Sequence, residues 1–438
     1  MSHRAASVLA AAVAACLAAP SCSAGSAATV APAPGGDDGG AVDAGAPADE
    51  AGVSFPAAHP QAPTVPSSGG TVLPSARIVP VFFRGETDEA TFTDLLGKYP
   101  ASSAWAAATT EYGIGVPAVA PAVHVTEAPP ATMSTPELGG WLQAHLDGTH
   151  PEWGPSDDAT LASSVYVLYP PASLALVAPR QDPSDPQAAT LCGARPWDLV
   201  GWHWQTTPAP GPAPAIAFAV IGRCTHGSVP VLDRMTATTA HELVEAVTDP
   251  FFETSRAYAF VDDAHAEWME LTGGGELGDL CPGDEQALFT PPDVGHVVQR
   301  TWSNAAAAAG HDPCVPAIAP AYFDAATDAP DAFVDPYVGV SVRGVAIPAG
   351  QSRTIDVHLF SDAPTDAWQV RAIDPMAADG QKPLLGLSLD RAAGRNGDVL
   401  RLKIQPLYAQ VGVTALYEID STLGDVTHRW YGEVVVTR

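Results

Sequence analysis

The sequence predicts a domain of the α+β or α/β class followed by an all-β, immunoglobulin-like sandwich domain. Apolar, strand-like runs alternate with helix-like segments over residues 75–318. Over residues 337–438 the apolar pattern has a period of two, and Gly, Pro and Asp interrupt it at short intervals. Residues 319–336 are rich in Ala, Asp and Pro and are expected to form a linker. A chain of 438 residues is long enough for two such domains.

The elements of the first domain follow from apolar runs and from turn residues. Buried strands are predicted where an apolar run is bounded by Pro or Gly, at 77–84, 163–169 and 215–221. Helices are predicted at 91–99, 101–112 and 135–146, with an extended segment at 116–125. The last helix is preceded by Ser134 and has Pro136 and Glu137 in its first turn, which predicts a capping box.

The second domain is predicted to consist of strands throughout. These strands are expected at residues 338–345, 353–360, 368–373, 384–389, 399–404, 414–419 and 430–437. The domain has no cysteine and no sequence cluster of histidines or carboxylates. We therefore expect a structural or adhesive role for it rather than a chemical one.

The charge balance excludes one class of partner. The chain carries 49 acidic and 20 basic side chains, which gives a formal net charge of −29. Proteins that bind nucleic acid neutralise phosphates with clustered Lys and Arg, and no basic cluster is present. Nucleic acid is therefore not an expected partner.

The N-terminus predicts export. Residues 1–22 have a basic start at Arg4 followed by an apolar run that is too short to span a membrane. Cys16 and Cys22 both follow lipobox-like residues, so a lipid anchor is predicted on one of them; cysteine parity favours Cys22, although Cys16 has the better match. The alternative is a plain secretory signal. We expect a cell-surface or outer-membrane lipoprotein or a secreted protein, which meets a membrane only through such an anchor.

Residues 23–74 are of low complexity and are predicted to be a disordered tether. The remaining cysteines all lie in the first domain. Export favours disulfides between them, and the local pairing joins Cys192 to Cys224 and Cys281 to Cys314. That pairing is one of three connectivities, between which the sequence alone does not decide. Metal binding is the alternative, but none of the four belongs to a C-x-x-C pair.

The helix predicted across residues 232–250 carries the most informative motif. Thr236 or Thr239 is a candidate for its cap, and Pro250 must end it. Within it, His241 and Glu245 are four residues apart and project from one face, with Glu242 directly after the histidine.

This layout is that of H-E-x-x-H zinc hydrolases with the second histidine replaced by Glu245. In such sites Glu242 has the position of the general base. The extra carboxylate lowers the Lewis acidity of a bound zinc ion and makes calcium an alternative ion. The alternative interpretation of the motif is the solvated face of an amphipathic helix.

A Gly-rich loop downstream supplies further carboxylates. Glu276 and Asp279 lie close to Cys281, and a zinc hydrolase often takes a third ligand from such a later segment. In one assignment Glu276 is that ligand and Asp279 supports a ligand without touching the metal. In the other, Asp279 is the ligand. The alternative to both is an ordinary glycine turn whose carboxylates accept hydrogen bonds from the backbone. Asp249 and His203 are weaker candidates for supporting positions.

Two motifs in order resemble those of a known family. The sequence has H-E-L-V-E-A-V-T-D-P at 241–250 and G-E-L-G-D-L-C at 275–281, preceded by G-W-H at 201–203. In this, residues 75–315 resemble the EXORDIUM or phosphate-induced secreted protein family and its bacterial relatives. The resemblance implies a secreted, disulfide-bonded domain with a zincin-like helix, and it implies no established reaction. Trp202 departs from the Tyr that is usual there.

Two functions are compatible with these observations. The first is an exported, surface-anchored, zincin-like metalloprotein that acts as a metal-dependent peptidase through Glu242. The second is a non-catalytic extracellular or cell-wall-associated binding protein with a structural metal or none. The partner is accordingly a peptide or a cell-surface molecule.

Overall fold

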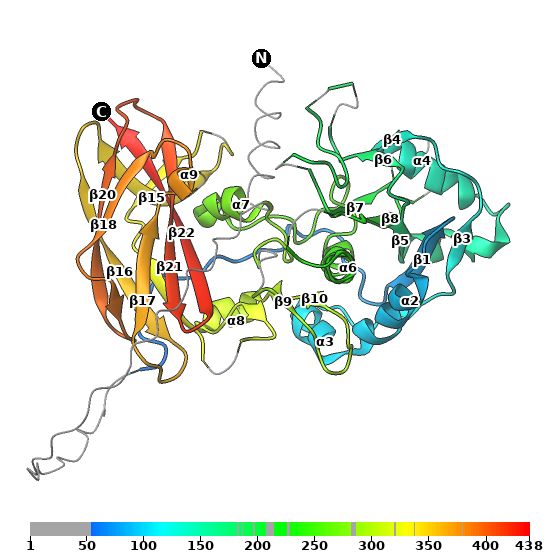
Figure 1. Ribbon diagram of the computed structural model, residues 1–438, viewed down its shortest axis with the longest axis horizontal. Helices are drawn as coiled ribbons and strands as arrows, with labels where there is room; N and C mark the ends of the chain where they lie inside the picture. Colours follow the sequence, from blue (N-terminus) through cyan, green and yellow to red (C-terminus); the bar gives the residue numbers. More distant parts are fainter. Residues whose placement is uncertain are drawn as a thin grey trace, which may run out of the picture.

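The computed structural model describes most of the chain after residue 53. The described residues are 54–181, 184–185, 187–195, 198–206, 214–225, 228–281, 286–318, 321–336, 338–378 and 380–438. The predicted signal segment with Cys16 and Cys22 lies outside them, as does residues 23–53 of the predicted tether. The described chain forms a mixed α/β lobe and a β lobe, which lie side by side (Figure 1).

The first lobe is built on a six-stranded sheet. Its order is β2-β1-β5-β8-β7, and β3 also pairs with β1. The strands are β1 (Arg77–Phe83), β2 (Ala118–Val119), β3 (Val123–Val125), β5 (Ser164–Tyr169), β7 (Gly201–Gln205) and β8 (Ala217–Ile221). The pairs are parallel except for β7, which is antiparallel to β8 at the edge. The predicted buried strands are confirmed, whereas β7 was not predicted.

Helices cover both faces of this sheet, as its apolar strands require. On one face α6 (Val231–Thr248) packs against β5, β7 and β8, together with α2 (Glu89–Lys98) and α3 (Ser103–Thr109). On the other face lies α4 (Thr135–His145). The smaller elements of the lobe are β4 (Thr132–Ser134), α5 (Asp158–Ala162), β6 (Ala175–Val177), α7 (Glu267–Thr272), β9 (Leu288–Phe289), β10 (Val298–Gln299), β11 (Thr301–Trp302), α8 (Asn304–Ala309) and β12 (Cys314–Val315).

The helix starts test two of the sequence predictions. The capping box of α4 is confirmed, because Ser134 and Glu137 each bond to the backbone of the other. The predicted cap of α6 is wrong. The helix begins at Val231, and the hydroxyls of Thr236 and Thr239 donate to the backbone carbonyls of Asp233 and Met235. A threonine inside a helix satisfies its hydroxyl in this way, so its presence alone does not mark a helix start.

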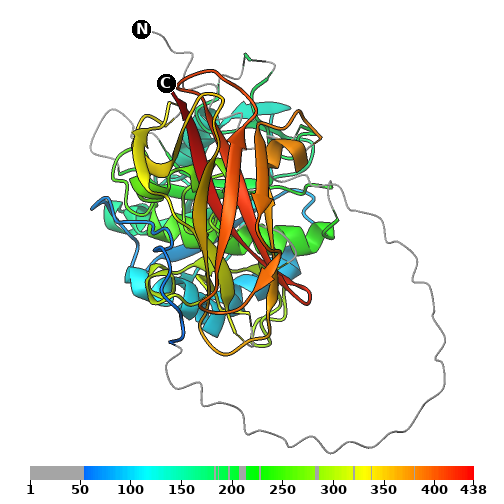
Figure 2. The same ribbon diagram turned by 90° about the vertical axis from the view of Figure 1, so that its left-hand side faces the viewer.

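The second lobe consists of two β-sheets. Their orders are β13-β16-β20-β18 and β14-β15-β22-β21-β17-β19. Figure 2 shows this lobe face-on, with its long strands running together. The elements are β13 (Phe323–Thr327), β14 (Asp331–Val334), β15 (Ser341–Pro348), β16 (Arg353–Ser361), β17 (Trp368–Ile373), α9 (Pro375–Ala378), β18 (Leu385–Leu389), β19 (Ala393–Gly394), β20 (Val399–Pro406), β21 (Thr414–Leu423) and β22 (Val426–Thr437).

The predicted linker at 319–336 is not a linker. It contains β13 and β14, which pair with β16 and β15. The Ala, Asp and Pro content that indicated a linker belongs to short strands and the turn between them. All of β13 is buried, so alanines serve there as small core residues.

The predicted tether is also shorter than expected. Residues 54–74 run along both lobes as an ordered segment, which we call the strap. Its backbone pairs with the first lobe from Ser68 to Ala257 and from Leu73 to Val247. At its start, Ala57 bonds to Asn396 of the second lobe. The strap has no apolar periodicity because backbone hydrogen bonds and single buried side chains, rather than a helix or sheet face, hold it in place.

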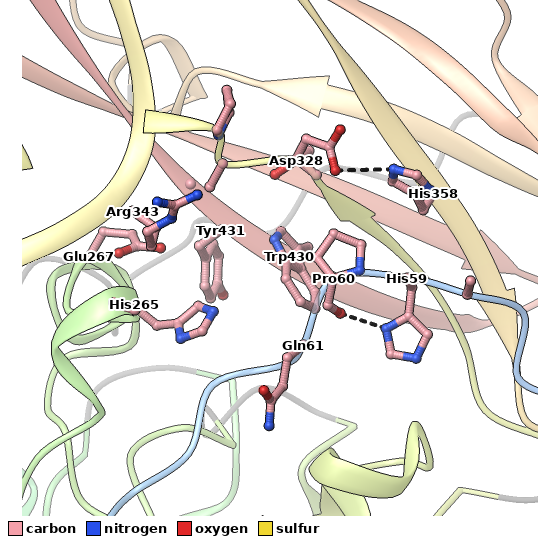
Figure 3. Close-up of a pocket in the computed structure, with 16 residues that line it drawn as sticks. His59, Pro60, Gln61, His265, Glu267, Asp328, Arg343, His358, Trp430 and Tyr431 are labelled. Carbon is pink, nitrogen blue, oxygen red and sulfur yellow. Dashed lines mark hydrogen bonds and ion pairs between the residues drawn. The ribbon is translucent and has the colours of Figure 1, made fainter. Parts of the chain in front are cut away.

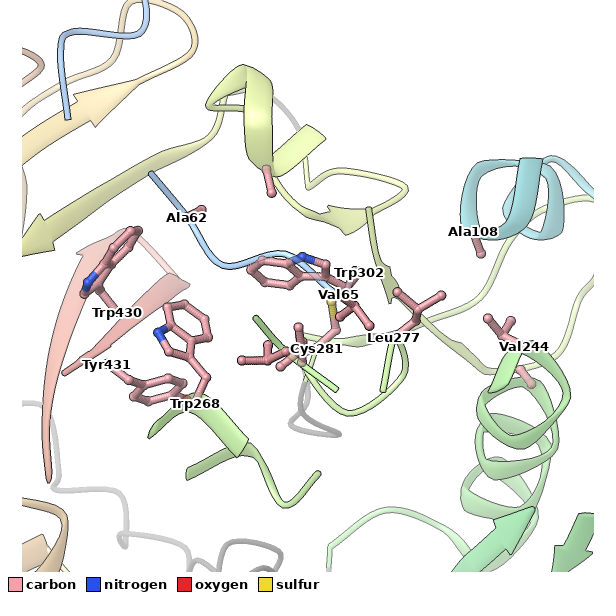
Figure 4. Close-up of a cluster of buried hydrophobic side chains, with 14 of the residues drawn as sticks. Ala62, Val65, Ala108, Val244, Trp268, Leu277, Cys281, Trp302, Trp430 and Tyr431 are labelled. Atoms are coloured by element: carbon pink, nitrogen blue, oxygen red, sulfur yellow. The ribbon is translucent and has the colours of Figure 1, made fainter. Parts of the chain in front are cut away.

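A continuous apolar core joins the two lobes. Trp268 of α7 lies 5.7 Å from Trp302 and, across the junction, 5.6 Å from Trp430 and 4.9 Å from Tyr431, measured between ring centroids. Figure 4 shows this cluster extending from Trp430 to Val244 of α6. The lobes therefore share buried apolar area, which couples their stabilities.

Two disulfides stabilise the first lobe. They join Cys192 to Cys224 and Cys281 to Cys314, which confirms the local pairing. Such bonds persist in oxidising compartments and are consistent with an exported chain. Among the described residues, no helix combines the length and hydropathy needed to cross a membrane.

We predict that Trp268→Ala destabilises the protein by about 3–5 kcal/mol, because it empties the centre of the junction. Urea denaturation followed by circular dichroism measures this change. Val334→Ala is the control, since Val334 is 66% exposed and its truncation should change the free energy of unfolding by less than about 0.5 kcal/mol. Equal effects of the two substitutions would contradict a shared core.

Candidate metal centre

The centre forms where α6 passes β7. The side chains of β7 alternate: Trp202 packs in the core on the α4 side of the sheet, and His203 points to the opposite face, toward α6. This alternation explains how a histidine between two tryptophans reaches a polar site. His203 is 6% exposed. In the sequence alone His203 is a weak candidate, because a histidine between two tryptophans is more often a packed residue than a ligand.

Glu245 is the carboxylate at which the two histidines meet. Its Oε2 lies 3.2 Å from Nε2 of His241 and 3.4 Å from Nδ1 of His203. Its Oε1 accepts a hydrogen bond of 3.1 Å from the backbone N–H of Gly278. One residue thus connects α6, β7 and the Gly-rich loop.

Glu242 approaches the same ring nitrogen of His203 as Glu245 does. Its Oε2 is 3.7 Å from Nδ1 of His203, and Glu242 is 4% exposed. That oxygen has no hydrogen-bond partner among the described residues. The helix therefore directs Glu242 and Glu245 toward the same imidazole, three residues apart on one face.

The Gly-rich loop after α7 brings two more carboxylates. Oδ1 of Asp279 lies 3.7 Å from Nε2 of His241, and Oε1 of Glu276 lies 3.4 Å from Nε2 of His203. Within the loop, Oδ2 of Asp279 accepts from the backbone N–H of Glu276. The two acidic residues therefore face different histidines.

Residues that follow the Gly-rich loop in the sequence hold it in place. The side-chain amide of Gln299 donates to the carbonyls of Gly278 and Cys281, at 2.7 and 2.8 Å. The N–H of Trp302 donates to the carbonyl of Leu277, and Cys281 is bonded to Cys314. Contacts on both strands of the β10–β11 segment thus fix the loop that carries Glu276 and Asp279.

Glycines allow the close approach of these segments. A Cβ at Gly278 would lie 2.7 Å from Oε1 of Glu245 and 2.7 Å from Nδ1 of His241. A Cβ at Gly274 would lie 1.9 Å from Oδ2 of Asp279, and one at Gly201 would lie 3.0 Å from Oε1 of Glu242. Any side chain at these positions would displace a group of the centre.

The carboxylates determine the charge of both imidazoles. Burial alone would lower the pKa of His203, but Glu276, Glu242 and Glu245 around it outweigh burial, and its pKa lies well above the usual value. For His241, burial is likewise outweighed by nearby carboxylates, chiefly Glu245, and the pKa is raised. The same field that favours imidazolium would favour a bound cation.

The acids of the centre differ from one another. The pKa of Glu245 is lowered to about 2, because the two histidines outweigh the effect of burial. Burial raises the pKa of Glu242 and of Glu276, and burial with the neighbouring Glu245 raises that of Asp279 to about 7. Glu245 is therefore the carboxylate that stays ionised.

The donor atoms form two overlapping groups in which a metal ion would fit. In the first, His241, Glu245 and Asp279 each offer one atom, all within 4.8 Å of one another. In the second, the same holds for His203, Glu242 and Glu245. Buried polar atoms without a hydrogen-bond partner among the described residues include Nε2 of His203, Oε2 of Glu242 and Oε1 of Glu276. A mixed imidazole and carboxylate set of this kind can hold a divalent metal ion.

Asp249 lies at the end of α6, and its side chain bonds to the backbone rather than to the centre. Its Oδ1 accepts a hydrogen bond of 2.6 Å from the N–H of Ala257, and the residue is fully buried. It therefore fixes the turn that follows the helix. Its other carboxylate oxygen has no hydrogen-bond partner among the described residues.

A third group lies in the β lobe and was missed in the sequence. Asp328, Asp356 and His358 come within the same 4.8 Å limit. Asp356 and His358 alternate along β16, and pairing with β13 brings Asp328 beside them. Sequence spacing does not show this, because Asp328 is distant along the chain. Here the partners are satisfied within the protein: His358 pairs with Asp328 and Asp356 with Arg401.

Comparisons with known proteins add little to this description. No protein-family model matches the chain, and no curated protein matches it. Over 22% of its length the chain is similar to chimeric titin Z1Z2 functionalised with a peptide from decorin, at 18% identity over 85% of that chain and a TM-score of 0.15. It is similar over the same share to the titin M3 domain, at 15% identity over 88% of that chain, again with a TM-score of 0.15. The two-sheet architecture therefore rests on the strand pairing itself.

We predict that Gly278→Ala destabilises the protein by about 1–3 kcal/mol, because the new methyl group overpacks Glu245 and His241. Thermal unfolding checks this. Gly97→Ala in α2 is the matched control, since a Cβ there meets nothing within 4 Å and the helix should gain about 0.5–1 kcal/mol. A neutral Gly278→Ala would show that the loop does not approach α6 as described.

Proposed function

We propose that this protein is an exported, zinc-dependent peptidase whose centre lies between α6, β7 and the Gly-rich loop. The observation that carries the proposal is the convergence of His241, Glu245 and Asp279 on one point, with Glu242 beside them. The H-E-x-x-E order on the helix and the zincin-like resemblance support the peptide bond as the class of substrate.

The proposed ligands are His241, Glu245 and Asp279. Of the two acidic residues in the loop, Asp279 faces His241, whereas Glu276 faces His203. This favours Asp279 as the third ligand and gives Glu276 the task of holding His203. His241 and Asp279 are also the more exposed members, with side chains 18% and 22% exposed, so substrate would approach from their side.

When bound, zinc would polarise the scissile carbonyl and lower the pKa of a water molecule. Glu242 would accept a proton from the attacking water at Oε2, which no protein donor among the described residues occupies, and would return it to the leaving amine. Burial raises the pKa of this carboxyl, which brings it closer to that of an effective proton carrier near neutrality.

His203 would act as a positioning residue. Its Nδ1 lies between Oε2 of Glu242 and Oε2 of Glu245, so it keeps the base and the ligand apart and oriented. Because His203 is on β7 and the two glutamates are on α6, this contact also fixes the helix against the edge of the sheet. Export is supported by the disulfides, and a lipid anchor on Cys22 or Cys16 remains part of the proposal.

The first prediction of this proposal concerns metal content. The purified protein should contain about one equivalent of zinc, and His241→Ala should lose it. Inductively coupled plasma mass spectrometry measures both. His311→Ala is the control, because His311 is an exposed histidine paired with Asp362 far from the centre. Calcium, or no metal, in the wild-type protein would instead favour the non-catalytic binding protein.

The second prediction separates catalysis from metal binding. Glu242→Gln should abolish hydrolysis of a fluorogenic peptide library, a loss of at least about a hundredfold, while zinc remains bound. The amide keeps the volume of the carboxyl but cannot accept the proton. Hydrolysis at the wild-type rate in this variant would remove Glu242 from the mechanism.

The third prediction tests the choice of ligand in the loop. Asp279→Asn should weaken zinc binding more than Glu276→Gln, whose effect through His203 should be about 10–100-fold at most. Competition with a chromogenic chelator gives both affinities. If Glu276→Gln proves the more damaging of the two, the ligand is Glu276 and the pairing with His203 is secondary.

A further inference from the structure

A cavity lies at the junction of the two lobes, away from the proposed metal centre. It has a volume of about 610 Å³, which is in the range of small-molecule sites. The first lobe, the second lobe and the strap all contribute to its walls. Figure 3 shows Glu267, Arg343, His265 and Tyr431 on one side and His59, Asp328 and His358 on the other.

Glu267 is a buried acid with one oxygen that lacks a hydrogen-bond partner among the described residues. It is the first residue of α7 and is 4% exposed, yet its Oε2 has no hydrogen-bond partner among the described residues. A buried carboxyl oxygen left in this state destabilises the folded protein. Burial raises its pKa well above the usual value, and Asp262, Glu270 and Asp335 add to that rise. A ligand bearing a positive charge would relieve both effects.

Arg343 supplies the opposite charge in the same cavity. It lies on β15 and is exposed, and it forms no ion pair in the part of the chain that the structure describes. Arg343 and Glu267 both line the cavity. A guanidinium and a buried carboxyl group thus share one cavity.

The remaining walls suit the body of a small organic ligand. Trp430 and Tyr431 lie side by side in the sequence of β22 and present aromatic surface, which also favours a nearby ammonium group. The imidazole of His59 is stacked on Phe360 at a centroid distance of 3.6 Å, and this holds the strap in place at the cavity. Glu267 belongs to none of the metal-capable groups of the described residues. Asp328 and His358, which line the cavity and belong to one, are already paired with each other.

We infer that the junction cavity binds a small zwitterion, namely an amino acid or a short peptide, whose ammonium pairs with Glu267 and whose carboxylate pairs with Arg343. The ammonium would take the place of the missing partner of the buried carboxyl. The guanidinium of Arg343 has the fork geometry that suits a carboxylate. This inference does not depend on the proposed peptidase activity, because it uses none of the residues of the metal centre.

The test is a calorimetric titration of the full-length protein with the dipeptide Gly-Leu. The protein carries Glu242→Gln and is dialysed against EDTA, so that the probe is neither cleaved nor bound through a metal. N-acetyl-Gly-Leu, which lacks the ammonium, and Gly-Leu amide, which lacks the carboxylate, are titrated in parallel. Circular dichroism confirms that each variant is folded.

Glu267→Gln should weaken Gly-Leu binding by about 10–100-fold and leave the weak binding of N-acetyl-Gly-Leu unchanged. Gln has the volume of a protonated Glu, so this variant should fold normally. Arg343→Gln should show the same pattern with Gly-Leu amide. Arg391→Gln is the control, since Arg391 is a comparably exposed arginine in the same lobe, paired with Asp398.

Two results would overturn the inference. One is the absence of binding of Gly-Leu up to about 10 mM, which is weaker than any functional site of this size requires. The other is binding that is indifferent to the blocked termini and to Glu267→Gln and Arg343→Gln. Either result leaves the metal centre untouched, because that site is tested by zinc content and by Glu242→Gln.

Discussion

The ionised carboxylate of Glu245 is the group on which the candidate metal centre depends. It is 3% exposed, and a charge buried to that degree must be paired and hydrogen-bonded. Three separate elements satisfy it: His241 from its own helix, His203 from β7 and the N–H of Gly278 from the Gly-rich loop. The contacts from β7 and from the loop require a close approach of backbones, and glycines at positions 201 and 278 allow it.

The junction between the lobes helps to hold the Gly-rich loop next to Glu245. The loop that carries Asp279 is fastened by Gln299 and by the Cys281–Cys314 disulfide, and both lie close to the aromatic cluster of Trp268 and Trp302. The β lobe packs on that cluster. It therefore buttresses the segment that completes the centre, although it contributes no group to it.

The sequence predicts elements well where a local pattern decides them and poorly where distant contacts do. The strands of the β lobe and the helix with His241 follow from periodicity and from Pro250. The strand β7 has only five residues, and its partner β8 defines it, so His203 was undervalued. The predictions for the strap and for β13 were wrong for a related reason. Long-range hydrogen bonds and the burial of small residues hold these segments in place, and neither leaves a periodic signal in the sequence.

The arrangement of charges argues that the centre was not selected for stability alone. A buried cluster of imidazoles and carboxylates is commonly no more stabilising than apolar residues of the same volume. Here the cluster also leaves Nε2 of His203 and Oε2 of Glu242 without hydrogen-bond partners among the described residues, and each such atom costs about 1–3 kcal/mol. A structural ion-pair network would be expected to satisfy these atoms. Buried polar atoms left without partners beside two metal-capable groups are instead what a cation site requires.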